Sequence, residues 1–342
     1  MTDRLGSCWR PASASLSGLA RPPNFTPRGQ GPRQVRPEPR AAALQIGKGL
    51  DDLQARQRGT KPGQRDVLLA DQGRHTRFER PVPVAIAVLI RGLALDFLVR
   101  KLRHGAWIDE DDERSLRTLY EGVRLVHARG DIIREGATPR FLTLVLEGWA
   151  CTYRDLGNGQ RQILSILLPG DLAEPFGILP DFADHSIGAV TQVTLAQVNP
   201  DAIRAAASAS PRIEQALWWD LLVTIAIERE HAVSLGRRTA SERLGHLLCE
   251  LHLRQALVGL AEGASCEFPL TQSELADLLG LSAVHVNRSL QDLRGRGLVS
   301  LRNRRLIIHE LEALRNFSFF DPDYLHADTD ALHSGELSLR GE

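Results

Sequence analysis

The polar residues best suited to recognising a partner lie on one face of the segment 282–296. Apolar residues recur there at i, i+4 and i+7, which is typical of an α-helix with one face in a core: Val286, Leu290 and Leu293. Opposite them stand Val284, Arg288 and Gln291, with Asn287 on one flank and His285 on the other. Arginine can grip O6 and N7 of guanine, asparagine can pair with an adenine edge, and valine can pack on a thymine methyl group. This face therefore has the chemistry to read base pairs in the major groove of DNA.

The surroundings of this face are suited to the phosphate backbone. Ser282 and His285 are placed for phosphate contacts, which set register rather than sequence. Between residues 283 and 305 a single acid, Asp292, accompanies six arginines: Arg288, Arg294, Arg296, Arg302, Arg304 and Arg305. The whole chain has 42 basic and 42 acidic residues and no net charge. The DNA affinity must therefore come from this local cluster.

Two short helices position the face. Thr271 and Glu274 have the spacing of a capping box, so a helix starts there. Gly280 ends it, and Ser282 can cap the next helix only two residues later. So tight a turn through glycine is typical of a helix-turn-helix. We expect Thr271 and Gln272, at the start of the first helix, to contact DNA as well.

Two short strands follow this motif, over residues 298–301 and 305–309, and form a wing around Arg302, Asn303 and Arg304. We expect Arg302 and Arg304 to contact the DNA backbone. The alternative is a winged helix that serves protein contacts, and it stays open at this point. Binding that weakens steeply with salt would favour DNA.

The first 85 residues differ in composition from the rest. Proline, glycine and arginine recur there where a core would need periodic apolar residues, as in Arg36-Pro37-Glu38-Pro39-Arg40. Such composition cannot bury enough apolar surface to fold. We interpret 1–85 as a disordered extension or as upstream DNA translated from a misassigned start codon; a basic arm that supplements DNA binding is the alternative.

Residues 93–205 predict a β-rich domain entered by helices over 93–102 and 109–127. Strands are expected over 131–136, 141–148, 149–154, 162–168 and 186–198, with a hairpin turn at Asn158-Gly159. Many short strands separated by turn residues are typical of a β-barrel or jelly roll. The fold class is therefore α+β.

A long helix is predicted from Pro211 to Leu235. Its apolar stripe is too long for one barrel to cover, so we expect it to pair with a second copy of the chain. The predicted dimerisation residues are Leu217, Leu221, Ile225, Glu228 and Leu235. A second helix over 240–258 leads into the DNA-binding domain, 236–315, and the segment 316–342 is a C-terminal tail whose residues 320–326 could dock on that domain.

A jelly roll, a long helix and a winged helix-turn-helix, in this order over residues 93–314, resemble the Crp/Fnr family of bacterial transcription regulators. In that family a cyclic-nucleotide-binding-like domain is joined by a dimerisation helix to the DNA-reading domain. Leu167–Leu172 looks like the family's strand-turn entry to the effector pocket, and Asp184–Val190 looks like the strand that leaves it. The resemblance implies a homodimer on a near-palindromic operator, and a contact with RNA polymerase if the protein is an activator.

The pocket residues depart from those of cyclic-AMP-binding members of the family. His185 stands where their phosphate-binding arginine is expected, and Glu228 and Arg229 stand where small hydroxyl residues should meet the purine. A neutral histidine offers neither the charge nor the bidentate fork. Cyclic AMP is therefore not expected, and the effector stays unidentified. The predicted pocket set is Glu174, His185, Ser186, Glu228 and Arg229.

No cofactor or metal is predicted. The four cysteines, Cys8, Cys151, Cys249 and Cys266, cannot supply the N-terminal thiolates of an iron–sulfur branch of the family, whereas haem stays open. His246, Cys249 and His252 span too wide an arc of a helix to bind one ion, so Cys249 is expected in the core and Cys266 in a loop.

Two other classes of function compete with the regulator. A cupin-like metal enzyme needs histidines converging in the barrel, commonly as His-x-His, and that pair does not occur. A sensor that acts through protein contacts alone is the second. The scattered cysteines and the lack of an apolar run of about 18 residues favour a cytoplasmic protein with no membrane span. We predict a DNA-binding regulator and not an enzyme.

Overall fold

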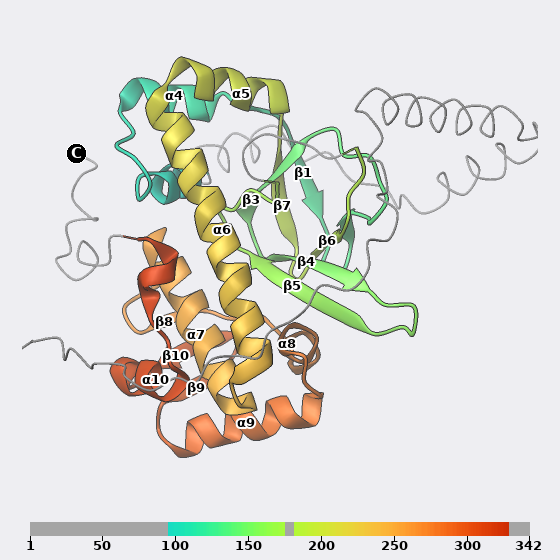
Figure 1. The fold of residues 1–342 in the computed structure, drawn as a ribbon, viewed down its shortest axis with the longest axis vertical. Helices are drawn as coiled ribbons and strands as arrows, with labels where there is room; N and C mark the ends of the chain where they lie inside the picture. The colour runs from blue at the N-terminus through green and yellow to red at the C-terminus, as the bar shows by residue number, and fades with distance from the viewer. Residues whose placement is uncertain (1–94, 175–180, 328–342) are drawn as a thin grey trace, which may run out of the picture. The chain divides into compact units, whose positions relative to one another are not determined.

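The computed structural model describes residues 95–174 and 181–327, and in these ranges the chain is α+β (Figure 1). A β-rich domain is followed by the long helix α6 (Pro211–Arg237) and then by a smaller, mainly helical domain. The predicted extension over 1–85 and the tail beyond residue 327 lie outside the described residues. In the part of the chain that is described, no helix is both long and apolar enough to cross a membrane.

Two antiparallel sheets form the β-rich domain and enclose an apolar core between them. Val145, Ile187 and Leu195 are almost fully buried in this core. The first sheet has the order β1 (Tyr120–Val126), β7 (Val193–Val198), β3 (Leu142–Glu147). The second has the order β2 (Asp131–Ile133), β6 (Ser186–Ala189), β4 (Ala150–Asp155), β5 (Arg161–Leu167). The order is not sequential, because β6 and β7 return to pair with earlier strands, and the predicted cyclic-nucleotide-binding-like jelly roll is confirmed.

The hairpin that joins β4 to β5 forms where the sequence predicts it. The amide of Leu156 donates to the carbonyl of Gln160 at 2.7 Å, and Gly159 has a φ of +81°. A side chain at that φ would be strained, which explains the glycine. The hairpin extends beyond the rest of the sheet, and α8 lies beside it (Figure 1).

Two elements of the β-rich domain differ from the prediction. The helix expected over 109–127 is only α4 (Glu110–Arg117), and the remainder is strand β1. Pairing with β7 overrides the helical pattern there, and this partner lies about 70 residues away in sequence, where no local pattern reveals it. The single strand expected over 186–198 is β6 and β7, which belong to different sheets.

The break between β6 and β7 has a clear physical cause. The amides of Val190 and Thr191 both donate to the carbonyl of Trp149, at 2.9 and 3.2 Å. These hydrogen bonds turn the chain at the point where it leaves one sheet for the other. Thr191 also accepts the amide of Trp149 through its hydroxyl, at 2.9 Å.

Helices cover one end of the β-rich domain. The predicted helix at 93–102 is described over residues 95–102, and Leu98 and Leu102 pack in a second apolar cluster with Ile203 of α5 (Pro200–Ala209). Ser210 then caps α6, which starts at Pro211 as predicted. Figure 1 shows α6 running from α5 past the sheets to the C-terminal domain.

The face of α6 that is open to solvent differs in part from the predicted one. Leu217 is only 1% exposed and packs in the core of its own chain, so it cannot lie on a seam between two subunits. Neighbouring positions take its place, and large apolar side chains stand exposed along one side of the helix: Trp218, Leu222, Val233 and Leu235. With the half-buried Leu221 and Ile225 they form one stripe about 160° wide at 3.6 residues per turn. This set is called the α6 stripe below.

The C-terminal domain is a helical core with a small sheet. Leu248, Leu275 and Leu293 meet in its centre and are fully buried. Residues 320–326 dock on this domain as predicted, since the Tyr324 hydroxyl donates to Glu250 Oε2 at 2.8 Å. The helices are α7 (Ala240–Leu257), α8 (Gln272–Leu279), α9 (Ala283–Gly295), α10 (Leu311–Ser318) and the 3₁₀ helix η3 (Pro322–Leu325). The sheet has the order β8 (Ser265–Glu267), β10 (Arg305–Ile308), β9 (Val299–Arg302).

Candidate nucleic-acid interface

The turn between α8 and α9 has the geometry that the sequence predicts. The amide of Thr271 donates to Glu274 Oε2 at 2.7 Å and the amide of Glu274 donates to the Thr271 hydroxyl at 3.2 Å, which completes a capping box. Gly280 ends α8 in the left-handed conformation at φ +61°. Ser282 caps α9 two residues later, accepting the amide of His285 at 3.3 Å. The two helices are therefore fixed as a helix-turn-helix.

Helix α9 separates its apolar residues from its polar ones. Val286, Leu290 and Leu293 are at most 2% exposed and hold the helix against α7 and α8. The predicted DNA-contacting residues are all exposed: Thr271, Gln272, Ser282, Val284, His285, Asn287, Arg288, Gln291, Arg302 and Arg304. Val284, at 60%, is exposed although it is apolar. Because Val284 packs in no core, its apolar side chain is free to contact an external apolar group such as a thymine methyl group.

The six arginines of this region fall into two groups. Arg294 donates to the carbonyl of Leu301, Arg296 pairs with Asp292, and Arg305 pairs with Glu262. The side chains of the other three, Arg288, Arg302 and Arg304, form no ion pair or hydrogen bond with any other residue that the structure describes. They are called the unpaired arginines below, and their guanidinium groups remain available to an external anion.

The wing holds two of the unpaired arginines at its tip. Strands β9 and β10 pair with Arg302 opposite Arg305, so the turn consists of Asn303 and Arg304. Both turn residues have positive φ, 51° and 60°, as a two-residue type I′ hairpin requires. The amide of Phe268 donates to the carbonyl of Arg304 at 2.7 Å and fixes the turn to the domain. The wing is thus a rigid support for exposed guanidinium groups.

One contact that the sequence did not reveal joins the two domains. Arg161 on β5 donates through Nε and Nη2 to Asp277 Oδ2 on α8, at 3.0 and 2.9 Å. Beside it, Gln162 Nε2 donates to the carbonyl of Leu278 at 3.1 Å. These residues are separated by 116 positions, so no local pattern brings them together. The first helix of the helix-turn-helix is therefore held by the β4–β5 hairpin.

The predicted core position of Cys249 is found in the structure, whereas Cys266 differs from its expected place. Burial raises the pKa of Cys249 to about 12. Cys266, expected in a loop, is fully buried in β8, and burial raises its pKa to about 11. His246 packs against Phe320 and Tyr324, and His252 lies 2.9 Å from the carbonyl of Gly263. Within the described ranges no group of three or more potential metal ligands comes together.

Burial also changes the proton affinity of His246. Its pKa falls to about 3 because the ring is buried and the Arg238 guanidinium lies close. Glu230 Oε1 stands 3.3 Å from His246 Nε2, but the same oxygen accepts a hydrogen bond from Arg238 Nη2 at 2.6 Å. The carboxylate is thus already neutralised, and the histidine remains uncharged.

The predicted effector residues do not all meet in one place. Glu174, His185 and Glu228 line a cavity between the β-rich domain and α6. Ser186 instead lies buried in β6, where its hydroxyl accepts the amide of Glu135 at 2.9 Å. Arg229 is exposed among the α6 stripe and does not line the cavity. Ser186 and Arg229 therefore do not belong to the cavity, contrary to the prediction.

Comparisons with known proteins agree with this architecture. Residues 242–317 match the model of the Crp-like helix-turn-helix domain, and residues 124–210 match that of the cyclic nucleotide-binding domain. The nitrogen fixation regulation protein FixK of Rhizobium meliloti is 31% identical over 200 residues, which cover 58% of this chain and 84% of the relative. This chain belongs to the Crp/Fnr family.

Further relatives of this Crp/Fnr regulator are regulators too. FixK of Bradyrhizobium diazoefficiens is 32% identical over 214 residues, and the match covers 58% of this chain and 84% of the relative. The transcriptional activator protein FnrL of Cereibacter sphaeroides is 28% identical over 212 residues, covering 60% of this chain and 85% of the relative. The solved structure of FixK2 from Bradyrhizobium japonicum superimposes with a TM-score of 0.51 at 24% identity, covering 57% of this chain and 96% of that chain. The predicted family and fold are confirmed: the chain is a transcription regulator with a helix-turn-helix DNA-binding domain.

Proposed function

We propose that this Crp/Fnr regulator reads its operator with α9 in the major groove and with its wing on the backbone. Val284, Asn287 and Arg288 face the base edges, and Arg302 and Arg304 meet phosphates. The observation that carries the proposal is the set of unpaired arginines, one on α9 and two on the wing. The other three arginines of the region already have partners within the chain.

A homodimer is the second part of the proposal. The α6 stripe leaves Trp218 48% and Leu222 55% exposed on a helix of 27 residues. An apolar stripe of this length, with Arg229 as a polar position within it, is typical of a helix that pairs with another helix. Pairing through α6 supplies two copies of α9, which suits two half-sites about one DNA turn apart on a near-palindromic operator. If the regulator activates transcription, it also contacts RNA polymerase.

The direct test compares base specificity between two variants. Duplexes enriched from a random pool by the unmodified protein provide the operator, and fluorescence anisotropy then measures affinity for each single-base change. Arg288→Ala should cost about 1–3 kcal/mol and relax specificity at one base pair of each half-site. Arg304→Ala should weaken binding to every sequence by a similar factor.

The matched control is Arg114→Ala, which removes an exposed arginine of α4 in the β-rich domain. It should leave the affinity and the base profile unchanged. An equal loss on every sequence for Arg288→Ala would show that α9 presents another face to the groove. No enrichment of any sequence would contradict the proposed operator reading altogether.

A further inference from the structure

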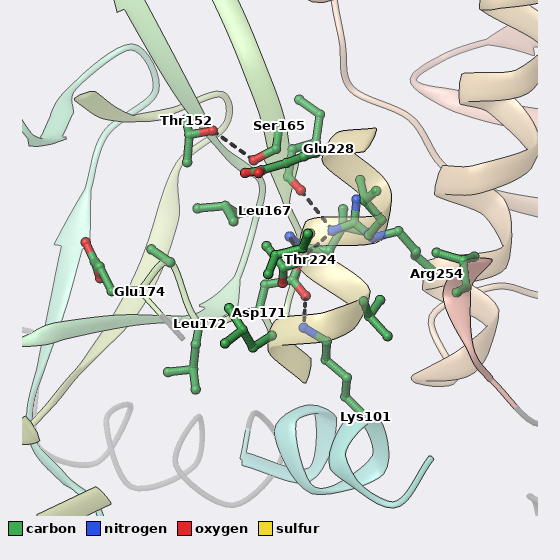
Figure 2. Close-up of a pocket in the computed structure, with 18 of the residues that line it drawn as sticks. Lys101, Thr152, Ser165, Leu167, Asp171, Leu172, Glu174, Thr224, Glu228 and Arg254 are labelled. Carbon is green, nitrogen blue, oxygen red and sulfur yellow. Dashed lines mark hydrogen bonds and ion pairs between the residues drawn. The ribbon is translucent and has the colours of Figure 1, made fainter. Parts of the chain in front are cut away.

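A cavity of about 410 Å³ lies where the β-rich domain, α6 and α7 meet. Leu167 and Leu172 line it from the β-rich domain, and Thr224 and Glu228 line it from α6 (Figure 2). Arg254, Leu257 and Val258 line it from the last turn of α7 and its end, within the DNA-binding domain. A molecule bound there would touch both domains of the regulator at once.

The two basic side chains that line the cavity, Lys101 and Arg254, already form ion pairs within the chain. Lys101 Nζ lies 2.6 Å from Asp171 Oδ1 and also 2.6 Å from Asp220 Oδ1. Arg254 Nη2 donates to Asp171 Oδ2 at 2.7 Å and to the carbonyl of Ile166 at 2.9 Å. Figure 2 shows Lys101 and Arg254 reaching Asp171 from two sides. Among the described residues that line the cavity there is no other lysine or arginine, so a phosphate or carboxylate ligand finds no free cationic side chain of that kind.

Two carboxylates of the cavity, in contrast, form no ion pair with a lysine or arginine of the described chain: Glu174 and Glu228. Glu174 Oε2 accepts the amide of Thr143 at 3.3 Å, and no lysine or arginine of the described chain pairs with it. Burial raises the pKa of Glu174 to about 7, with His185 opposing the shift. His185 itself is held by Asp184 at 2.7 Å. Glu228, on the α6 wall, also has no ion pair within the described ranges.

The rest of the lining is mainly apolar. Leucine, isoleucine and valine side chains of both domains cover most of it, and Trp219 adds an aromatic wall. The hydroxyl groups of Thr152 and Ser165 lie 2.8 Å apart and satisfy each other. The open polar positions are therefore the carboxylates of Glu174, which is half-buried, and Glu228, which is exposed. A carboxylate that is withdrawn from solvent and has no cationic partner is stabilised most by a cation that donates a hydrogen bond.

We propose that this cavity binds an apolar small molecule that carries a protonated amine, and that Glu174 accepts the amine. The inference deepens the proposed function, because it names the chemical class of the signal that the DNA-binding domain would sense. The apolar body fills the space between β5 and α6, and contact with Leu257 and Val258 transmits its presence to α7. A cyclic nucleotide is disfavoured, since its phosphate would face two carboxylates.

Calorimetric titration of the unmodified full chain with three molecules of similar shape tests whether the cavity prefers an amine. The probes are 4-phenylbutylamine, 4-phenylbutanol and 4-phenylbutyrate, which share an apolar body and differ only in the charge of their end group. The amine should bind on the order of tenfold more tightly than the alcohol and the carboxylate, as expected for a charge-assisted hydrogen bond. Glu174→Gln should remove this preference, whereas Glu214→Gln, an exposed position at the start of α6, should keep it.

The unmodified protein alone can refute the proposal, so it does not depend on the folding of a variant. Equal or tighter binding of the carboxylate or of cyclic AMP would overturn it, and so would the absence of heat from all three probes at millimolar concentration. Operator anisotropy on the same preparation separates this failure from that of the proposed function. Retained operator binding with no amine preference would reject only the ligand class.

Discussion

The DNA-binding surface and the interdomain cavity both contain arginine, but they use it in opposite ways. The side chains of Arg288, Arg302 and Arg304 are exposed and have no partner within the described chain, whereas Arg254 is buried and bonded to Asp171. An exposed guanidinium keeps its hydration until a phosphate or a base replaces water. A buried one is tolerated only with a carboxylate beside it. The availability of a cation, not its presence, decides which site can bind an anion.

The largest expected effect comes from breaking the pairing in the cavity. Asp171→Asn leaves Lys101 and Arg254 buried without their shared carboxylate. Burial opposes the charge of both Lys101 and Asp171, but the carboxylates of Asp171 and Asp220 raise the pKa of Lys101, and Lys101 and Arg254 lower the pKa of Asp171. The free energy of unfolding should fall by about 3–5 kcal/mol, as for other broken buried pairs. Urea denaturation measures it.

The control for that variant is Asp201→Asn, which removes one partner of an exposed pair with Arg204 on α5. It should change stability little, because solvent screens such pairs. A loss below 1 kcal/mol for Asp171→Asn would mean that Asp220 and Glu250, which also pair with Lys101 and Arg254, are sufficient to neutralise the two cations.

A pH dependence of intermediate size should mark the buried histidines. The folded-state pKa of His246, about 3, lies below the value of 6.5 expected when the chain unfolds. Between those values the unfolded chain binds a proton that the folded chain does not, so stability falls as the pH is lowered below 6.5. Each such group contributes about 1.4 kcal/mol per pH unit in that window.

His246→Gln should reduce the slope of the unfolding free energy against pH, between pH 6 and 4.5, by the contribution of one proton. His231 and His252, whose pKa values burial also lowers, should keep their part of the slope. Denaturation at four pH values gives the comparison. An unchanged slope would indicate that His246 is protonated in the folded chain.

The smallest effect is expected at the contact between the two regions. Arg161→Ala removes the hydrogen bonds to Asp277 and releases α8 from the β4–β5 hairpin. Stability should fall by less than about 1 kcal/mol, because the pair is partly exposed. Hydrogen exchange of the α8 amides should nevertheless accelerate relative to Arg134→Ala, which breaks an exposed pair elsewhere. Equal exchange in both variants would argue that the hairpin does not hold α8.

The DNA-binding surface was predictable because its signals are local. The Thr271–Glu274 capping box, Gly280 and Ser282 lie within twelve residues, and each specifies a helix end by its own chemistry. The apolar spacing of α9 then fixes which side chains face outwards. Family membership follows from the same pattern and from the order of the domains.

The cavity was not predictable in the same way. Lys101 and Asp171 are 70 positions apart, and Asp171 and Arg254 are 83 apart, so only the folded chain shows that they pair. Non-local pairing likewise turned the predicted helical segment at 120–126 into β1. Leu217 was misplaced because periodicity alone does not say which of two apolar faces of α6 the chain itself covers.

The salt dependence of operator binding tests most directly whether the unpaired arginines bind the DNA backbone. The logarithm of the affinity, plotted against the logarithm of the salt concentration, should fall steeply for the unmodified protein. In Arg302→Ala/Arg304→Ala the slope should become shallower by roughly one unit for each phosphate contact removed, while Arg114→Ala keeps the original slope. An identical slope in all three proteins would contradict the assignment of the wing to the phosphate backbone.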